Sequence, residues 1–156
     1  MLSQDHVTTD PVALKAAVSE LVLRSWWNID REAGIGGEEF FAPDGVCEMP
    51  ARRMSGRAQI AEGYAARRVA GNRLSRHLVT NLLVEAAPSG RIEASYVLVL
   101  HAGIGTAPLP LRPPQAVCDV VDRFARCEDG LLIADRRLEA VFVDEDADSV
   151  MLRRPR

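Results

Sequence analysis

The chain has 156 residues, 47% apolar and 26% charged, which is the length and composition of one ordinary globular domain. Its 19 basic and 22 acidic residues give a net charge of −3 at pH 7 and are interspersed, so the chain lacks the basic stripe that nucleic-acid binding requires. The three cysteines lack C-x-x-C spacing, the N-terminus lacks a signal-peptide pattern, and the apolar runs are too short to cross a membrane. We therefore expect a cytoplasmic protein with neither nucleic acid nor membrane as partner.

The first expected element is an amphipathic helix that begins near residue 10. Thr9 or Asp10 is suited to cap its N-terminus, and Pro11 is suited to its first turn. Apolar residues then recur at three- and four-residue steps and form one broad face. Asp30 follows four residues after Trp26 and therefore projects from the edge of that face. A carboxylate beside an apolar face departs from the binary pattern, and such departures often mark function.

Shorter elements are expected next. A glycine-rich segment over 34–37 breaks the helix, and a short helix or turn follows it. Residues 46–54 predict a brief edge strand, which their proline stops. Residues 55–71 predict a further helix with Tyr64 on its inner stripe and the pair Arg67–Arg68 towards solvent.

The remainder of the chain is expected to form strands. These strands lie over residues 76–86, 91–103, 115–127 and 131–143, with a proline-rich loop between the second and third. Helices followed by long antiparallel strands predict an α+β fold, with about three helices against one face of a curved antiparallel sheet. One domain over 10–143 is expected, with an N-terminal tail over 1–9 and a mobile C-terminal tail over 144–156.

Four segments of the chain resemble the SnoaL-like branch of the NTF2-like superfamily. They are "WWNIDREA…FFAPDGV", "GRAQI", "SRHLVTNLLVE" and "VVDRFARCEDGLLIADRRL". The parts "RHLVTN" and "IADRR" are also similar to β subunits of ring-hydroxylating dioxygenases, which share the fold. The resemblance implies a cone, in which a strongly bent antiparallel sheet wraps around the helices and leaves an internal pocket. Because this fold hosts dehydratases, cyclases, isomerases, hydrolases and inert scaffolds, it does not specify an activity.

The resemblance implies that Asp30 and His77 both face the pocket. The carboxylate would then accept a hydrogen bond from one ring nitrogen of His77, and the other nitrogen would be available for general acid–base catalysis. The alternative is a structural pair that closes the mouth of the pocket.

Most of the large side chains are expected to form ordinary core, and some of them are expected to line the pocket. Trp26, Met54 and Tyr64 are the residues expected to contact a flat or apolar organic molecule with a few oxygen atoms. No metal site or cofactor is expected, because the three histidines are far apart in the sequence and no carboxylate cluster accompanies them.

Two further polar residues have two interpretations each. Asn81 lies four residues after His77, so it is expected on the same strand face, where it would bind substrate or satisfy the backbone of a bent sheet. Arg136 would hold an anionic substrate group or form a cross-strand ion pair with Asp122.

The sequence therefore predicts a cofactor-independent small-molecule enzyme or binder. If it is an enzyme, we expect dehydration, isomerisation or cyclisation of a hydrophobic polyketide-like, steroid-like or aromatic compound. The alternatives are a non-catalytic subunit similar to a dioxygenase β subunit and a plain ligand-binding module. A homodimer is the default assembly and a trimer is possible, because residues such as Leu78, Leu98 and Leu100 are expected to leave apolar surface outside the sheet.

Overall fold

The computed structural model describes residues 10–146. These residues form two α-helices, one short 3-10 helix and six strands. The elements are α1 (Pro11–Arg31), η1 (Gly37–Phe40), β1 (Phe41–Met49), β2 (Arg52–Ser55), α2 (Gly56–Val69), β3 (Arg73–Ala86), β4 (Ile92–Ile104), β5 (Ala116–Cys127) and β6 (Gly130–Val143). The expected tails over 1–9 and 144–156 lie outside the described residues, apart from residues 144–146.

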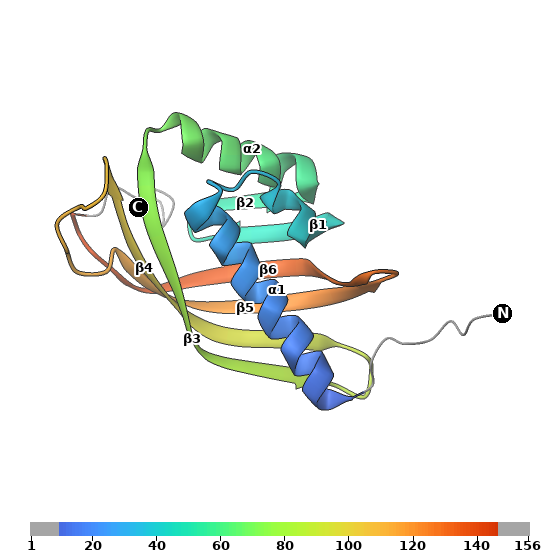
Figure 1. The fold of residues 1–156 in the computed structure, drawn as a ribbon. Coiled ribbons are helices and arrows are strands. Elements are labelled where there is room, and N and C mark those ends of the chain that lie inside the picture. Colours follow the sequence, from blue (N-terminus) through green and yellow to red (C-terminus); the bar gives the residue numbers. More distant parts are fainter. Residues whose placement is uncertain (1–9, 147–156) are drawn as a thin grey trace.

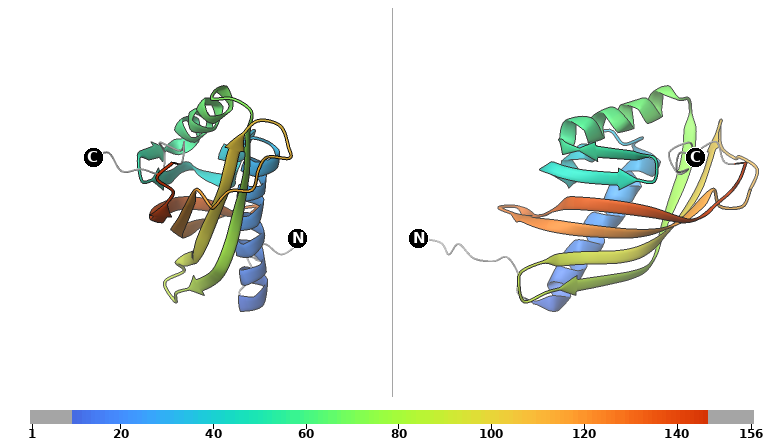
Figure 2. Two further views of the ribbon diagram at one scale, coloured as in Figure 1. Left: turned by 90° about the vertical axis from the view of Figure 1, so that its left-hand side faces the viewer. Right: turned by 180° about the vertical axis from the view of Figure 1, so that it is seen from behind.

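All six strands belong to one curved sheet that wraps around α1 (Figure 1). The strand order is β2-β1-β6-β5-β4-β3. α1 crosses the concave face, α2 packs against β1 and β2, and the upper parts of β3 and β4 bend away from the rest of the sheet (Figures 1 and 2). The predicted α+β cone is confirmed.

The sheet is mixed, whereas the sequence predicts an antiparallel one. β1 and β6 run parallel, while every other neighbouring pair is antiparallel. The parallel pair arises because α2 carries the chain from β2 to the far edge at β3, and the meander then returns to lie beside β1. β1 is therefore an inner strand, and the expected edge position belongs to β2. Pairing between strands so distant in sequence has no local signature.

α1 forms where its sequence predicts it. The Asp10 side chain caps the helix by accepting a hydrogen bond from the backbone N–H of Val12 at 3.1 Å, and Pro11 occupies the first turn. Its apolar stripe is buried against the sheet, with Val18 and Val22 wholly inaccessible to solvent. Because Asp30 is the penultimate residue of α1, this packing places its carboxylate beside β3.

β3 carries a bulge that changes the face of its later residues. Thr80 pairs with Val97 and Leu83 with Ser95, so β3 has one residue more than β4 between these two pairs. Asn81 lies within the bulge at φ +54°, a left-handed conformation that asparagine tolerates better than most residues. The alternation that would return Asn81 to the face of His77 is broken there, and Asn81 is exposed.

The expected division of leucines between the two faces of the sheet also needs correction. Leu98 and Leu100 belong to the core, at 2% and 7% exposure, whereas Leu78 is 48% exposed. Leu100 is the register partner of His77, so an inward His77 places Leu100 on the inner face as well. Leu98 follows it to that face because strand side chains alternate with a period of two.

Candidate active site

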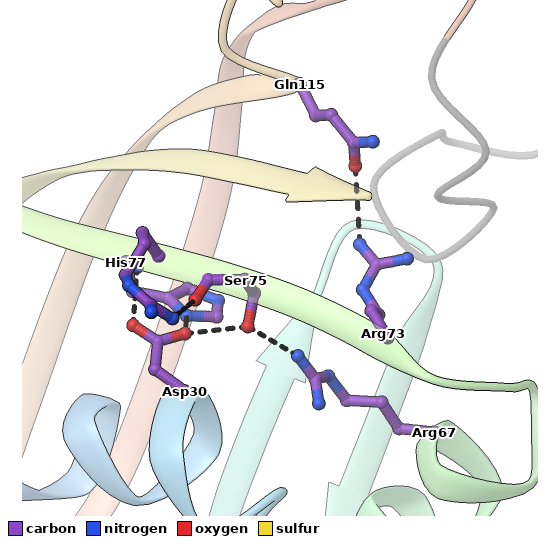
Figure 3. A network of polar contacts seen from close by, with 7 residues as sticks. Asp30, Arg67, Arg73, Ser75, His77 and Gln115 are labelled. Carbon is purple, nitrogen blue, oxygen red and sulfur yellow. Dashed lines mark hydrogen bonds and ion pairs between the residues drawn. The ribbon is translucent and has the colours of Figure 1, made fainter. Parts of the chain in front are cut away.

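Asp30 and His77 meet where the C-terminal turn of α1 packs against β3 (Figure 3). The backbone N–H of His77 donates to Asp30 Oδ2 at 2.7 Å, and His77 Nδ1 lies 2.7 Å from Asp30 Oδ1. Ser75 Oγ also donates to Oδ1, at 2.7 Å. The two side chains are only 7% and 10% exposed, for Asp30 and His77 respectively. The structure thus brings the two expected catalytic residues into direct contact, while their catalytic roles stay a prediction.

The surroundings of Asp30 keep its carboxylate ionised. Burial alone raises the pKa of Asp30, but hydrogen bonds from His77 and Ser75, and the charge that His77 carries when it is protonated, outweigh burial, so the pKa is lowered overall. An ionised carboxylate only accepts hydrogen bonds. The hydrogen between Asp30 and His77 is therefore assigned to Nδ1, which leaves a lone pair on Nε2.

At His77 burial is the larger effect on the pKa, whereas at Asp30 the hydrogen bonds and the charge outweigh it. Burial lowers the pKa of His77 by more than the hydrogen bond and charge of Asp30 raise it, and the positive charges of Arg67 and Arg73 lower it further. His77 is therefore neutral at pH 7. Its neutral ring is a proton acceptor without prior deprotonation.

Nε2 of His77 is the ring nitrogen that Asp30 does not hold. Among the described residues no group hydrogen-bonds to Nε2, whereas Nδ1 is held by Asp30. In this part of the chain the one fully buried, unpaired side-chain oxygen or nitrogen is Asn28 Oδ1. Nε2 is not among these enclosed atoms, although the His77 side chain as a whole is only 10% exposed.

Trp26 supports the imidazole from the side of α1. Its ring stacks on His77 with centroids 4.8 Å apart and an interplanar angle of 25°. Its Nε1–H donates to Tyr96 Oη at 2.8 Å, and that hydroxyl donates to Asp122 Oδ2 at 3.0 Å. Tyr96 and Asp122 are both buried, so these two hydrogen bonds fix the plane of the indole ring on which the imidazole stacks.

Arg136 lies in the core as half of an ion pair with Asp122. Its Nε and Nη2 donate to the two carboxylate oxygens at 2.8 and 2.6 Å, and Nη2 also donates to Ser25 Oγ at 2.9 Å. The guanidinium also lies 4.4 Å from the centre of the Trp26 ring. The side chains of Arg136 and Asp122 are 1% and 0% exposed. This geometry fits the cross-strand ion pair rather than a group awaiting an anionic substrate.

The other expected pocket residues lie apart from His77. Met54 is buried against Gly63 of α2, and the ring of Tyr64 covers Gly34 and Gly37 so closely that a Cβ on either glycine would collide with it. Burial raises the pKa of Tyr64, so this phenol keeps its proton. Neither side chain has a hydrogen bond or ring contact with His77 among the described residues.

Sequence reasoning missed two residues of the site, Ser75 and Arg67. Ser75 is 3% exposed and bonds to Asp30, and Arg67 Nη2 donates to Ser75 Oγ at 2.6 Å. The spacing of Ser75 could have revealed it, because it precedes His77 by two residues and so shares its face. The helical pattern predicts Arg67 towards solvent, but it is half-buried, while Arg68 is exposed.

A cavity of about 390 Å³ lies beside α1, away from the His77 site. Its lining residues are Leu23, Arg24, Trp27, Asn28, Glu32 and Phe40. None of the expected site residues lines this cavity. Within residues 10–146 no three His, Cys, Asp or Glu side chains are grouped to hold a metal ion, and no helix is long and apolar enough to span a membrane.

Comparison with known families matches residues 10–137 to the SnoaL-like domain, over most of the folded chain. The chain belongs to the SnoaL-like family. A search of curated proteins finds no match for it.

Solved structures similar to this SnoaL-like protein cover most of its length. A protein from Catenulispora acidiphila in complex with S-DNPA is 26% identical, with a TM-score of 0.69 over 83% of this chain and 94% of that one. ActVI-ORFA from Streptomyces coelicolor is 20% identical, with a TM-score of 0.72 over 83% and 98%. A scytalone dehydratase-like protein from Novosphingobium aromaticivorans is 12% identical, with a TM-score of 0.75 over 92% and 93%. The last two likenesses concern the fold alone.

Proposed function

We propose that the protein is a cofactor-independent enzyme that transfers protons on a hydrophobic, carbonyl-bearing small molecule. The observation that carries this proposal is the asymmetry of His77, whose Nδ1 is held by Asp30 while Nε2 has no partner among the described residues. A neutral imidazole with one nitrogen fixed by a carboxylate and the other unprotonated can act as a general base. The compounds proposed are polyketide-like, steroid-like or aromatic.

Each residue has one task in the proposed reaction. His77 Nε2 removes a proton from a carbon next to a carbonyl, and the same nitrogen can return it to carbon or to a leaving hydroxyl. Asp30 holds the Nδ1–H tautomer and stabilises the imidazolium that forms. Dehydration, isomerisation and cyclisation all begin with this step, so the site by itself does not select among them.

The S-DNPA complex of the Catenulispora acidiphila protein supports a small-molecule ligand for this chain. The stacked Trp26 ring also supports a ligand with a flat apolar part, because the indole and imidazole already form one aromatic surface at the site.

Hydrogen–deuterium exchange tests the proposal without knowledge of the natural product. 2-Tetralone, a flat ketone with acidic α-protons, is incubated with the full chain in D₂O and followed by proton NMR. We expect saturable acceleration over buffer, and His77→Gln should reduce it by about 100-fold or more with little change in melting temperature. The glutamine amide keeps a donor for Asp30 but offers no base.

Three results would contradict the proposal. Exchange by the His77→Gln variant at the wild-type rate would remove the imidazole from the reaction. Saturable binding without any exchange would identify a ligand-binding module instead, and copurification with a larger iron–sulfur protein would identify a non-catalytic subunit.

We further propose that the protein is a cytoplasmic homodimer. On the outer face, Leu78, Val99, Val117 and Phe142 are successive register partners across four strands and form one apolar row. Leu78 and Phe142 at its ends are 48% and 68% exposed. A second copy would cover this row by twofold symmetry. The location rests on the three cysteines, all of which are free thiols.

A further inference from the structure

Arg67 reaches the candidate active site from a third element. It lies in the last turn of α2, and its Nη2 donates to Ser75 Oγ on β3 at 2.6 Å. Ser75 in turn contacts Asp30 of α1, which contacts His77 (Figure 3). A continuous chain of three short hydrogen bonds therefore joins the guanidinium to the imidazole.

The chemistry of the partners fixes the direction of every bond in this chain. A guanidinium only donates, so Ser75 Oγ must accept from Arg67. An ionised carboxylate only accepts, so the single hydroxyl proton of Ser75 must point to Asp30. Arg67 occupies an accepting position of the hydroxyl oxygen and so holds that oxygen in place between the guanidinium and the carboxylate. With Arg67 in place, both Ser75 and His77 Nδ1 donate to Asp30 Oδ1.

Arg67 also acts on His77 through space. The charged groups that influence His77 are Asp30 from α1, Arg67 from α2 and Arg73 from β3 itself. Asp30 favours the protonated imidazole, whereas both arginines oppose it. Arg67 is half-buried, so its charge is less screened than that of the exposed Arg68 beside it.

We propose that Arg67 is a positioning residue that, through Ser75, orients the Asp30 carboxylate and holds His77 as a neutral base with Nε2 unprotonated. The proposal rests on the proposed function of His77. Arg67 itself need not touch the substrate.

Arg68 provides a matched control, since it has the same charge in the same helical turn. Its Nη1 donates to the backbone carbonyl of Ala33 at 3.2 Å and is no part of the chain to Asp30. In Arg67→Gln we expect the pKa of His77 to rise, because an opposing charge is lost, and the exchange of 2-tetralone protons to fall about tenfold. In Arg68→Gln neither should change, and Arg67→Lys should return the pKa of His77 towards the wild-type value.

Titration of His77 by nitrogen-15 NMR in the full chain separates this proposal from the preceding one. If the wild type exchanges no protons, the proposed function fails, while the titration still reports the influence of Arg67. A His77 pKa that is the same in wild type and Arg67→Gln, or that moves equally in Arg68→Gln, overturns the proposal. If the Arg67→Gln variant does not fold, Ser75→Ala is used instead. The pKa of Asp30 should then rise, because Asp30 loses the hydrogen bond from Ser75. An unchanged pKa of Asp30 would again overturn the proposal.

Discussion

Replacement of Asp30 by asparagine tests the hydrogen bonds of the candidate site most directly. Asp30 Oδ1 accepts from Ser75 Oγ and His77 Nδ1, and Oδ2 accepts from the His77 backbone N–H, each at 2.7 Å. Asparagine has the same shape but offers one accepting oxygen and one donating nitrogen. The three donors that face Asp30 therefore cannot all be satisfied by an amide in its place.

Both orientations of the new amide disturb His77. If the amide oxygen faces Ser75 and Nδ1, the amide nitrogen opposes the His77 backbone N–H, and one buried donor is left unpaired. If the amide is reversed, its nitrogen donates to Nδ1 and the proton of His77 moves to Nε2. The first orientation costs about 1–3 kcal/mol of stability, and the second removes the base from Nε2.

We therefore expect Asp30→Asn to lose about 1–3 kcal/mol in free energy of unfolding and about 100-fold or more in 2-tetralone exchange. Urea unfolding and the exchange assay measure the two quantities on the same sample. The control is Asp10→Asn at the N-cap of α1, where asparagine caps as well as aspartate and both quantities should stay near wild type. Retention of the wild-type exchange rate by Asp30→Asn would show that Asp30 does not hold His77 as the base.

Three further outcomes are expected. Arg136→Met should lower the free energy of unfolding by about 3–5 kcal/mol in urea, because it leaves the buried carboxylate of Asp122 unpaired. The control is Arg137→Met at an exposed position, which should change it by no more than about 0.5 kcal/mol. Equal effects of the two substitutions would show that the buried pair is not stabilising. The free energy of unfolding should fall as the pH falls through 6.5. The pKa of His77 is lowered in the folded chain, so below this pH the unfolded chain binds a proton at His77 more readily than the folded chain does. An equal fall in the His77→Gln variant would assign the effect to other groups. Phe142→Glu should convert a dimer into single chains in sedimentation equilibrium, and an unchanged mass would place the interface elsewhere.

Local patterns in the sequence predict the elements of this fold well. The cap and the apolar period of α1 and the cap of α2 near Ser55 are all short-range signals, and the structure has the elements that they indicate. The parallel pairing of β1 with β6 is a long-range property of the chain path. It depends on where α2 delivers β3, which no local pattern encodes.

The candidate site divides in the same way. Asp30 and His77 each depart from an apolar pattern, so single residues reveal them. Asn81 fails as a prediction of strand alternation because one additional residue in a bulge reverses the alternation beyond it. No pattern in the sequence indicates Arg67, because an arginine near the end of a helix is common on a solvent-exposed face. Its side chain points inward only because the fold places Ser75 within hydrogen-bond distance.

The protonation state of His77 at pH 7 is the property on which the proposed chemistry depends. Nitrogen-15 NMR of the wild-type chain distinguishes the two neutral tautomers from each other and from the imidazolium. The expected spectrum is that of a neutral ring with the proton on Nδ1 and none on Nε2, and with a pKa below 6.5. A proton on Nε2 at pH 7, in either the other tautomer or the imidazolium, would contradict the account.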